Sequence, residues 1–87
     1  MAVYMVNRDL PGITMDQLAA AQKAAIETSQ QFTSEGKQVR YIRSTFVPEA
    51  SNCMCLFESS SPELVKEVND KANIPYSSVV EALDLTP

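Results

Sequence analysis

The sequence predicts an α+β fold with the element order β-α-β-β-α-β. Two segments rich in Ala, Leu, Gln, Lys and Glu are typical of helices, and segments rich in β-branched and aromatic residues flank them. Pro and Gly residues mark several of the boundaries. The chain has 87 residues, 45% hydrophobic and 21% charged, which is ordinary for a globular protein and leaves room for one domain over residues 1–87.

The first half of the chain is expected to begin with a strand and a long helix. An apolar run at residues 3–6 predicts a strand buried on both faces, and the polar residues after it predict a loop. Thr14 and Gln17 have the spacing of a capping box, in which each side chain satisfies the other's backbone N–H group. They predict the start of a helix over residues 15–35, and Gly36 supplies the left-handed conformation that ends it.

The second half supplies two strands, a helix and a last strand. β-branched and aromatic residues predict a strand over residues 38–47, and residues 49–52 form a turn into a third strand at residues 53–58. Pro62, preceded by three serines, predicts the first turn of a second helix. Val and Leu residues predict a last strand over residues 78–85.

This order is the split β-α-β, or ferredoxin-like, arrangement: a four-stranded antiparallel sheet with two helices on one face and the first and third strands in its middle. If the open face met water, the central strands would alternate apolar and polar residues. Both central strands instead carry apolar residues on both faces, at residues 3–6 and 53–57. A second copy of the chain, packed sheet to sheet, would cover the open face. The sequence therefore predicts a homodimer in the form of a dimeric α+β barrel.

Charge and composition exclude several classes of function. The chain has seven Lys and Arg residues and eleven Asp and Glu residues, which gives a formal net charge of −4. We therefore expect no nucleic-acid partner and no membrane partner. The absence of His excludes Ser-His-Asp and Cys-His catalysis as well as histidine metal sites. No apolar stretch reaches the length of a transmembrane helix and no signal-peptide core is visible, so a cytoplasmic location is expected.

The spacing of Cys53 and Cys55 is the one in this sequence that indicates a possible metal site. On a strand, residues two apart project from the same face, so both thiolates can converge on one soft metal ion such as nickel, copper(I), zinc or cadmium. Two cysteines this close are not a disulfide framework, and we expect reduced thiols. The alternative interpretation is that both are small buried apolar residues, as free cysteines often are.

A second group of residues predicts a ligand cleft. Strict alternation along a strand places Tyr41 and Arg43 on one face and Arg40 on the other. If Arg43 points between the two sheets of a barrel, its forked guanidinium binds a carboxylate or phosphate of a small ligand. The alternative is a solvated charge at the edge of the sheet. The candidate cleft comprises Tyr4, Tyr41 and Arg43.

Several stretches of the chain resemble a known family. They include RDLPGIT at residues 8–14, VRYIRSTFVP at residues 39–48 and CMCLFE at residues 53–58. These stretches are similar to the small nickel-responsive, nickel-binding ferredoxin-like proteins, a bacterial family also described as a domain of unknown function, and the similarity covers nearly the whole chain. The resemblance implies a dimeric ferredoxin-like barrel that binds nickel, with metal ligands at Cys53 and Cys55.

Two hypotheses from different classes of function follow. The leading one is a non-enzymatic, cytoplasmic homodimer that binds or senses a soft metal, nickel first, through the thiolates of Cys53 and Cys55. The alternative is a dimeric α+β barrel that binds a small molecule, as a cofactor-independent monooxygenase or cyclase, by analogy of fold. An apolar cavity near Tyr4, Tyr41 and Arg43 would favour the alternative, and a filled barrel would count against it.

Overall fold

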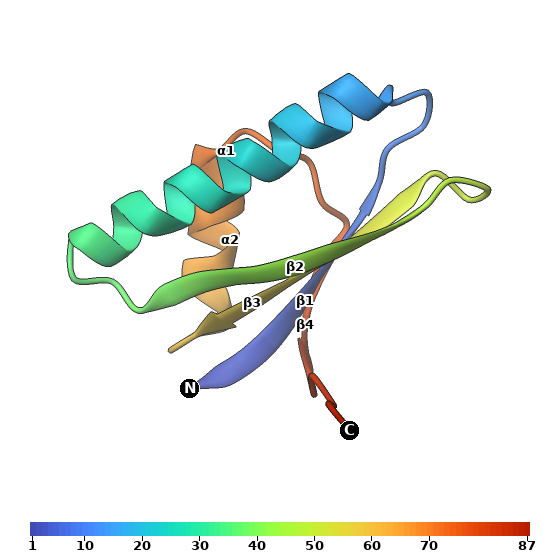
Figure 1. Ribbon diagram of the computed structural model, residues 1–87. Helices are drawn as coiled ribbons and strands as arrows, with labels where there is room; N and C mark the ends of the chain where they lie inside the picture. Colours follow the sequence, from blue (N-terminus) through green and yellow to red (C-terminus); the bar gives the residue numbers. More distant parts are fainter.

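The computed structural model describes residues 1–87 and contains six elements in the predicted order. They are β1 (Ala2–Asp9), α1 (Met15–Ser34), β2 (Val39–Val47), β3 (Asn52–Ser59), α2 (Pro62–Lys71) and β4 (Ser78–Ala82). The strands form one antiparallel sheet in the order β2-β3-β1-β4, and both helices cover the same face of it (Figure 1). The predicted ferredoxin-like fold is confirmed, with the first and third strands in the middle of the sheet.

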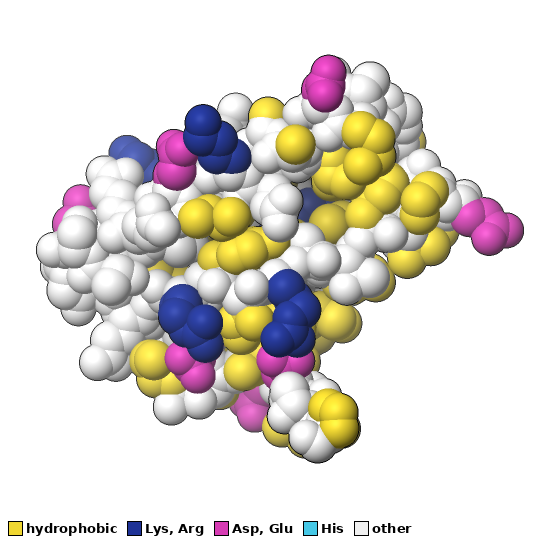
Figure 2. All heavy atoms as spheres, in the orientation of Figure 1, with side chains coloured by type: hydrophobic (Ala, Val, Ile, Leu, Met, Phe, Trp, Pro, Cys, Tyr) yellow, Lys and Arg dark blue, Asp and Glu magenta, His cyan; other side chains and the backbone are white.

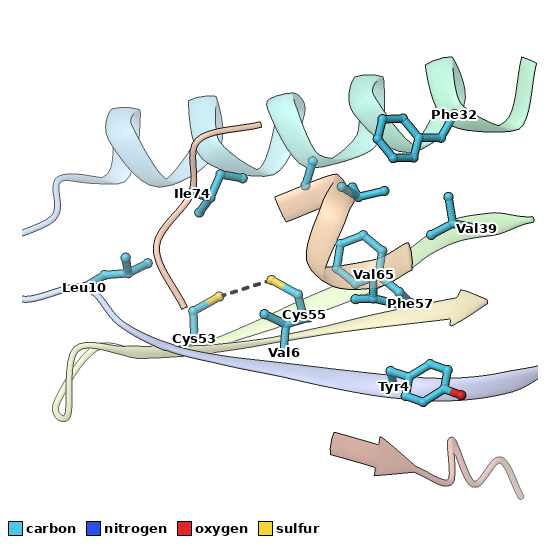
Figure 3. Close-up of a cluster of buried hydrophobic side chains, with 12 residues drawn as sticks. Tyr4, Val6, Leu10, Phe32, Val39, Cys53, Cys55, Phe57, Val65 and Ile74 are labelled. Carbon is cyan, nitrogen blue, oxygen red and sulfur yellow. Dashed lines mark hydrogen bonds between the residues drawn. The ribbon is translucent and has the colours of Figure 1, made fainter. Parts of the chain in front are cut away.

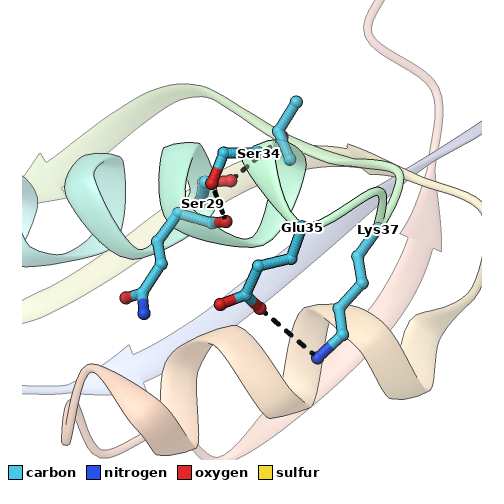
Figure 4. Close-up of polar contacts among 6 residues, drawn as sticks. Ser29, Ser34, Glu35 and Lys37 are labelled. Carbon is cyan, nitrogen blue, oxygen red and sulfur yellow. Dashed lines mark hydrogen bonds and ion pairs between the residues drawn. The ribbon is translucent and has the colours of Figure 1, made fainter.

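The long helix α1 begins at the predicted capping box. The Thr14 hydroxyl accepts a hydrogen bond from the Gln17 backbone N–H at 3.1 Å, and the Gln17 side-chain oxygen accepts one from the Thr14 backbone N–H at 3.0 Å. At the other end Ser34 donates to the Gln31 carbonyl at 2.6 Å, and the ammonium group of Lys37 lies 3.8 Å from a carboxylate oxygen of Glu35 (Figure 4). Both ends of α1 are therefore held by local contacts that the sequence encodes.

Strand β1 is longer than the sequence predicted. Residues 7–9 were expected to form a loop, but they continue the ladder with β3 as far as the pair Asp9 and Asn52. Strand β4, in contrast, ends at Ala82 rather than at residue 85. In β1 the charged residue Arg8 shares the buried face with the apolar residues Tyr4 and Val6.

The core lies between the sheet and the two helices. Alternate residues of the central strands are buried and meet apolar side chains of α1 and α2 (Figure 3). The buried strand residues include Tyr4, Val6, Cys53, Cys55 and Phe57, and the helical ones Ala25, Phe32, Val65 and Val68. None of the helices has the length and apolar character needed to span a bilayer.

The other face of the sheet carries no helix (Figure 1). The residues between the buried ones project from it, and the ladder brings apolar side chains of three adjacent strands together: Val3, Met5, Met54, Leu56 and Val80. Val80 is 45% exposed, and the side chains of Leu83 and Leu85, just beyond β4, are 81% and 84% exposed. The expectation of a first strand buried on both faces therefore does not hold for the single chain, because no helix covers this face and Val3 and Met5 are only half-buried.

A β-bulge in β2 changes which residues share a face. The ladder pairs Tyr41 with Phe57 and Arg43 with Leu56, so Ile42 is an extra residue without a partner. Tyr41 consequently lies on the helix-covered face and Arg43 on the open one. The expectation that these two side chains share a face is wrong, because strict alternation fails across a bulge.

Candidate functional site

A cavity of about 130 Å³ lies between α1 and the sheet. It collects side chains from β1, α1, β2 and β3 and from the loop after α2. Its apolar lining comprises Leu10, Leu18, Ala21, Ala25, Phe46 and Ile74, and its other lining residues are Arg8, Gln22, Ser44, Cys53 and Cys55. Figure 2 shows yellow hydrophobic side chains gathered on this face, with a dark blue basic side chain set back among them. Both predicted metal ligands line this cavity.

The two cysteines project from β3 toward α1 (Figure 3). Their Sγ atoms are 3.9 Å apart, both thiols are free, and their residues are only 2% and 5% exposed. A chain of hydrogen bonds reaches them from α1: Gln22 donates to the Tyr41 hydroxyl at 2.9 Å, that hydroxyl is 2.6 Å from Ser44 Oγ, and Ser44 donates to Cys55 Sγ at 3.0 Å. These contacts fix the position of the Cys55 thiol in the cavity.

The environment keeps Cys53 protonated at neutral pH. Burial raises the pKa of the Cys53 thiol to about 11, and charge repulsion and hydrogen bonding from Cys55 act in the same direction. The Arg8 guanidinium and the Ser44 hydroxyl lower this pKa by smaller amounts. A metal ion that binds here must therefore displace the proton of a neutral thiol.

Arg8 also lines the cavity, although its place after the predicted first strand indicated a turn. It is 2% exposed, and its guanidinium donates from Nη2 to Asn69 Oδ1 at 2.8 Å and from Nη1 to the Pro75 carbonyl at 3.3 Å. Both acceptors are neutral, and none of the four ion pairs of the chain includes Arg8. The available signal was its spacing, two residues after Val6 on the same face of an extended strand.

The three residues of the predicted ligand cleft do not share one face of the sheet. Tyr4 and Tyr41 lie on the helix-covered face on either side of Phe57, and the Tyr41 ring meets the Phe57 ring edge to face with centroids 5.5 Å apart. Arg43 lies on the open face, where its Nη1 is 2.6 Å from Asp84 Oδ1. The bulge separates Arg43 from the two tyrosines, so the three residues named for the small-molecule hypothesis do not converge.

The distance between the two thiols suits a soft metal ion, but two ligands alone do not complete a metal site. With metal–sulfur bonds of about 2.3 Å and a tetrahedral angle, two thiolates would stand about 3.8 Å apart. The observed Sγ separation of 3.9 Å is close to that value. No group of three or more Cys, Asp or Glu side chains is placed to hold a metal ion, so further ligands must come from hydroxyl groups, water or a bound anion.

Comparison with known proteins decides the family. The family model described as nickel-responsive protein SCO4226-like matches residues 4–82. The chain belongs to this family. A search of curated proteins gives no match. The crystal structure of SCO4226 from Streptomyces coelicolor A3(2) is similar, with a TM-score of 0.80 and 25% sequence identity over 99% of this chain and 100% of that one. The resemblance identified in the sequence is confirmed, and the SCO4226-like match includes Arg8, Cys53 and Cys55.

Proposed function

We propose that this protein acts in a nickel response as a non-enzymatic homodimer that binds a soft metal ion through Cys53 and Cys55. Membership of the nickel-responsive family supports nickel as the first metal to test. The observation that carries the site is the pair of free thiols, 3.9 Å apart on one face of β3 and lining a cavity. Reduced thiols of this kind suit the cytoplasm.

Binding at this pair exchanges thiol protons for a metal ion. Two thiolates balance the charge of one divalent cation, which favours its transfer into a buried site. The raised pKa of Cys53 opposes the exchange, and the nearby Arg8 guanidinium favours the thiolate. Nickel affinity should therefore rise with pH throughout the neutral range, because binding releases thiol protons and a lower proton concentration in solution favours their release.

The open face of the sheet supports the homodimer. Its apolar residues belong to three adjacent strands, and monomers rarely leave a continuous apolar patch uncovered. Two ion pairs, Arg43 with Asp84 and Arg40 with Glu58, lie on the same face as this patch, and they would have to stay paired in an interface there. Two sheets packed face to face would form a dimeric α+β barrel. The thiols are on the opposite face of the sheet, so each copy would keep its own metal site.

Isothermal titration with nickel tests the metal site. The protein is purified without an affinity tag and stripped with a chelator before titration. Wild type should bind one nickel ion per chain, and the Cys53→Ser, Cys55→Ser double variant should not bind it there. Glu49→Gln, which removes an exposed carboxylate of the β2–β3 turn, is the matched control and should behave as wild type. Equal heats from wild type and the double variant would refute the site.

A further inference from the structure

The buried guanidinium of Arg8 lacks a counter-charge. A buried charge is costly unless an opposite charge or several hydrogen bonds compensate it. Asn69 and the Pro75 carbonyl accept from two of its N–H groups, whereas a guanidinium carries five. No carboxylate of the chain is within ion-pair distance, and Arg8 lines the cavity beside α1. An anion in this cavity would supply the missing charge.

The rest of the cavity specifies what kind of anion fits. Most of its lining is apolar, with Leu18, Phe46 and Ile74 among the contributors, and Arg8 is its only cation. Such surroundings favour a single negative charge attached to a hydrocarbon body over a multiply charged inorganic anion. The volume of about 130 Å³ is slightly below the roughly 150 Å³ of an engineered apolar cavity that binds benzene. A ligand of about six heavy atoms therefore matches it.

We propose that this cavity binds a small monocarboxylate, with the carboxylate on Arg8 and the hydrocarbon body against the apolar lining under α1. A carboxylate accepts two N–H groups of one guanidinium side by side, which gives both charge compensation and orientation. The thiols of Cys53 and Cys55 lie beside the bound carboxylate but do not bind it. The inference goes beyond the proposed function, because it requires no metal ion.

Butanoate, with six heavy atoms, is the probe. Its binding to metal-free, chelator-treated protein is measured by isothermal titration and by chemical-shift changes in NMR spectra. Butanamide keeps the body and removes the charge, acetate keeps the charge and shortens the body, and inorganic phosphate tests the preference for a monocarboxylate. We expect saturable butanoate binding that shifts the resonances of Leu18 and Ile74. The three comparison ligands should each bind at least about tenfold more weakly than butanoate: butanamide because it loses a charged hydrogen bond, acetate because it buries two fewer CH2 groups, and phosphate because it has no hydrocarbon body.

Two variants test the two parts of the site. Arg8→Met removes the charge, and Ala21→Leu fills the apolar part while leaving Arg8 in place; each should weaken butanoate binding at least about tenfold. Arg43→Met removes an arginine from the opposite face and is the matched control, which should bind as wild type does. If Arg8→Met does not fold, the Ala21→Leu variant and the comparison ligands still test whether the cavity binds the carboxylate.

Several results would overturn the proposal. They are no saturable butanoate binding, equal binding of butanoate and butanamide, phosphate binding as tight as that of butanoate, or unchanged affinity in Ala21→Leu. Because these titrations contain no nickel, a negative butanoate result would not count against nickel binding at Cys53 and Cys55. Conversely, a failed nickel titration would leave a positive butanoate result intact.

Discussion

At the scale of single residues, Cys53 and Arg8 determine the chemistry of the cavity. Cys53 is a buried thiol whose surroundings favour its neutral form, whereas Arg8 is a buried cation whose charge favours an anion nearby. The spacing of the cysteines was enough to predict their shared face, since residues two apart on a strand project together. Arg8 was not predictable in the same way, because its partners Asn69 and Pro75 lie 61 and 67 positions away in the sequence.

The raised pKa of Cys53 predicts a loss of stability above pH 9. The thiol titrates near its ordinary value of 9.0 in the unfolded chain and at about 11 in the folded one. Between these values the unfolded state releases a proton that the folded state keeps. The free energy of unfolding should therefore fall as pH rises, by at most about 1.4 kcal/mol for each pH unit between these two values, and the contribution is complete below pH 9.

Urea unfolding of wild type and Cys53→Ser at about pH 8 and about pH 10.5 measures this effect. All other titratable groups are common to both proteins, so the difference between the two proteins isolates the Cys53 thiol. Wild type should lose more stability than the variant between the two pH values. An equal loss would mean that the pKa of Cys53 is not raised.

Asn69 should be important for stability because it connects Arg8 to α2. It is fully buried, accepts a hydrogen bond from Arg8 and donates one from Nδ2 to the Val65 carbonyl at 2.8 Å. Asn69→Ala leaves a buried guanidinium N–H without its acceptor, and we expect a loss of about 2–3 kcal/mol in urea unfolding. Lys66→Ala, an exposed change in the same helix, should stay within about 0.5 kcal/mol. A similarly small loss for Asn69→Ala would contradict the bonded geometry.

At the scale of elements, local signals predicted most of the architecture. The capping box of α1, the Pro at the start of α2 and the β-branched content of the strands are signals from neighbouring residues. Each expected element is present, although β1 is longer and β4 shorter than predicted. The bulge at Ile42 has no such local signal. It places Arg43 on the face of the sheet opposite to Tyr41. Strand periodicity is reliable only where the ladder is regular.

The capping box itself gives a testable prediction for α1. Thr14→Ala removes the acceptor for the Gln17 N–H, and the free energy of unfolding should fall by about 1 kcal/mol. Gln30→Ala, an exposed change in the interior of the same helix, should be close to neutral. Urea unfolding at neutral pH distinguishes the two. If Thr14→Ala were as mild as Gln30→Ala, the box would not contribute to the stability of the helix.

At the scale of the whole molecule, the two faces of the sheet differ in what they contact. The covered face holds the core and the cavity with its thiols, and the open face presents the apolar patch assigned to a second copy. The order of elements was predicted completely because a chain this short has few ways to arrange them. The cavity was not predicted, because it depends on how side chains from β1, α1, β2 and β3 pack together.

The homodimer predicts the effect of a charge placed on the open face. Analytical ultracentrifugation at micromolar concentration should give twice the chain mass of 9.6 kDa for wild type. Met5→Lys, in the middle of the patch, should shift the protein to a monomer because a buried interfacial charge lacks a partner. Met15→Lys changes a methionine that is 70% exposed at the start of α1, and it should remain a dimer. A wild-type mass of 9.6 kDa would contradict the barrel.

The most direct measurement of the proposed function is the X-ray absorption fine structure at the nickel edge, on tag-free protein stripped with a chelator and then loaded with one nickel ion per chain. Each nickel ion should have two sulfur neighbours, supplied by Cys53 and Cys55. In the Cys53→Ser, Cys55→Ser double variant the sulfur neighbours should disappear. A nickel shell of oxygen and nitrogen atoms alone in the wild-type protein would contradict the proposed metal site.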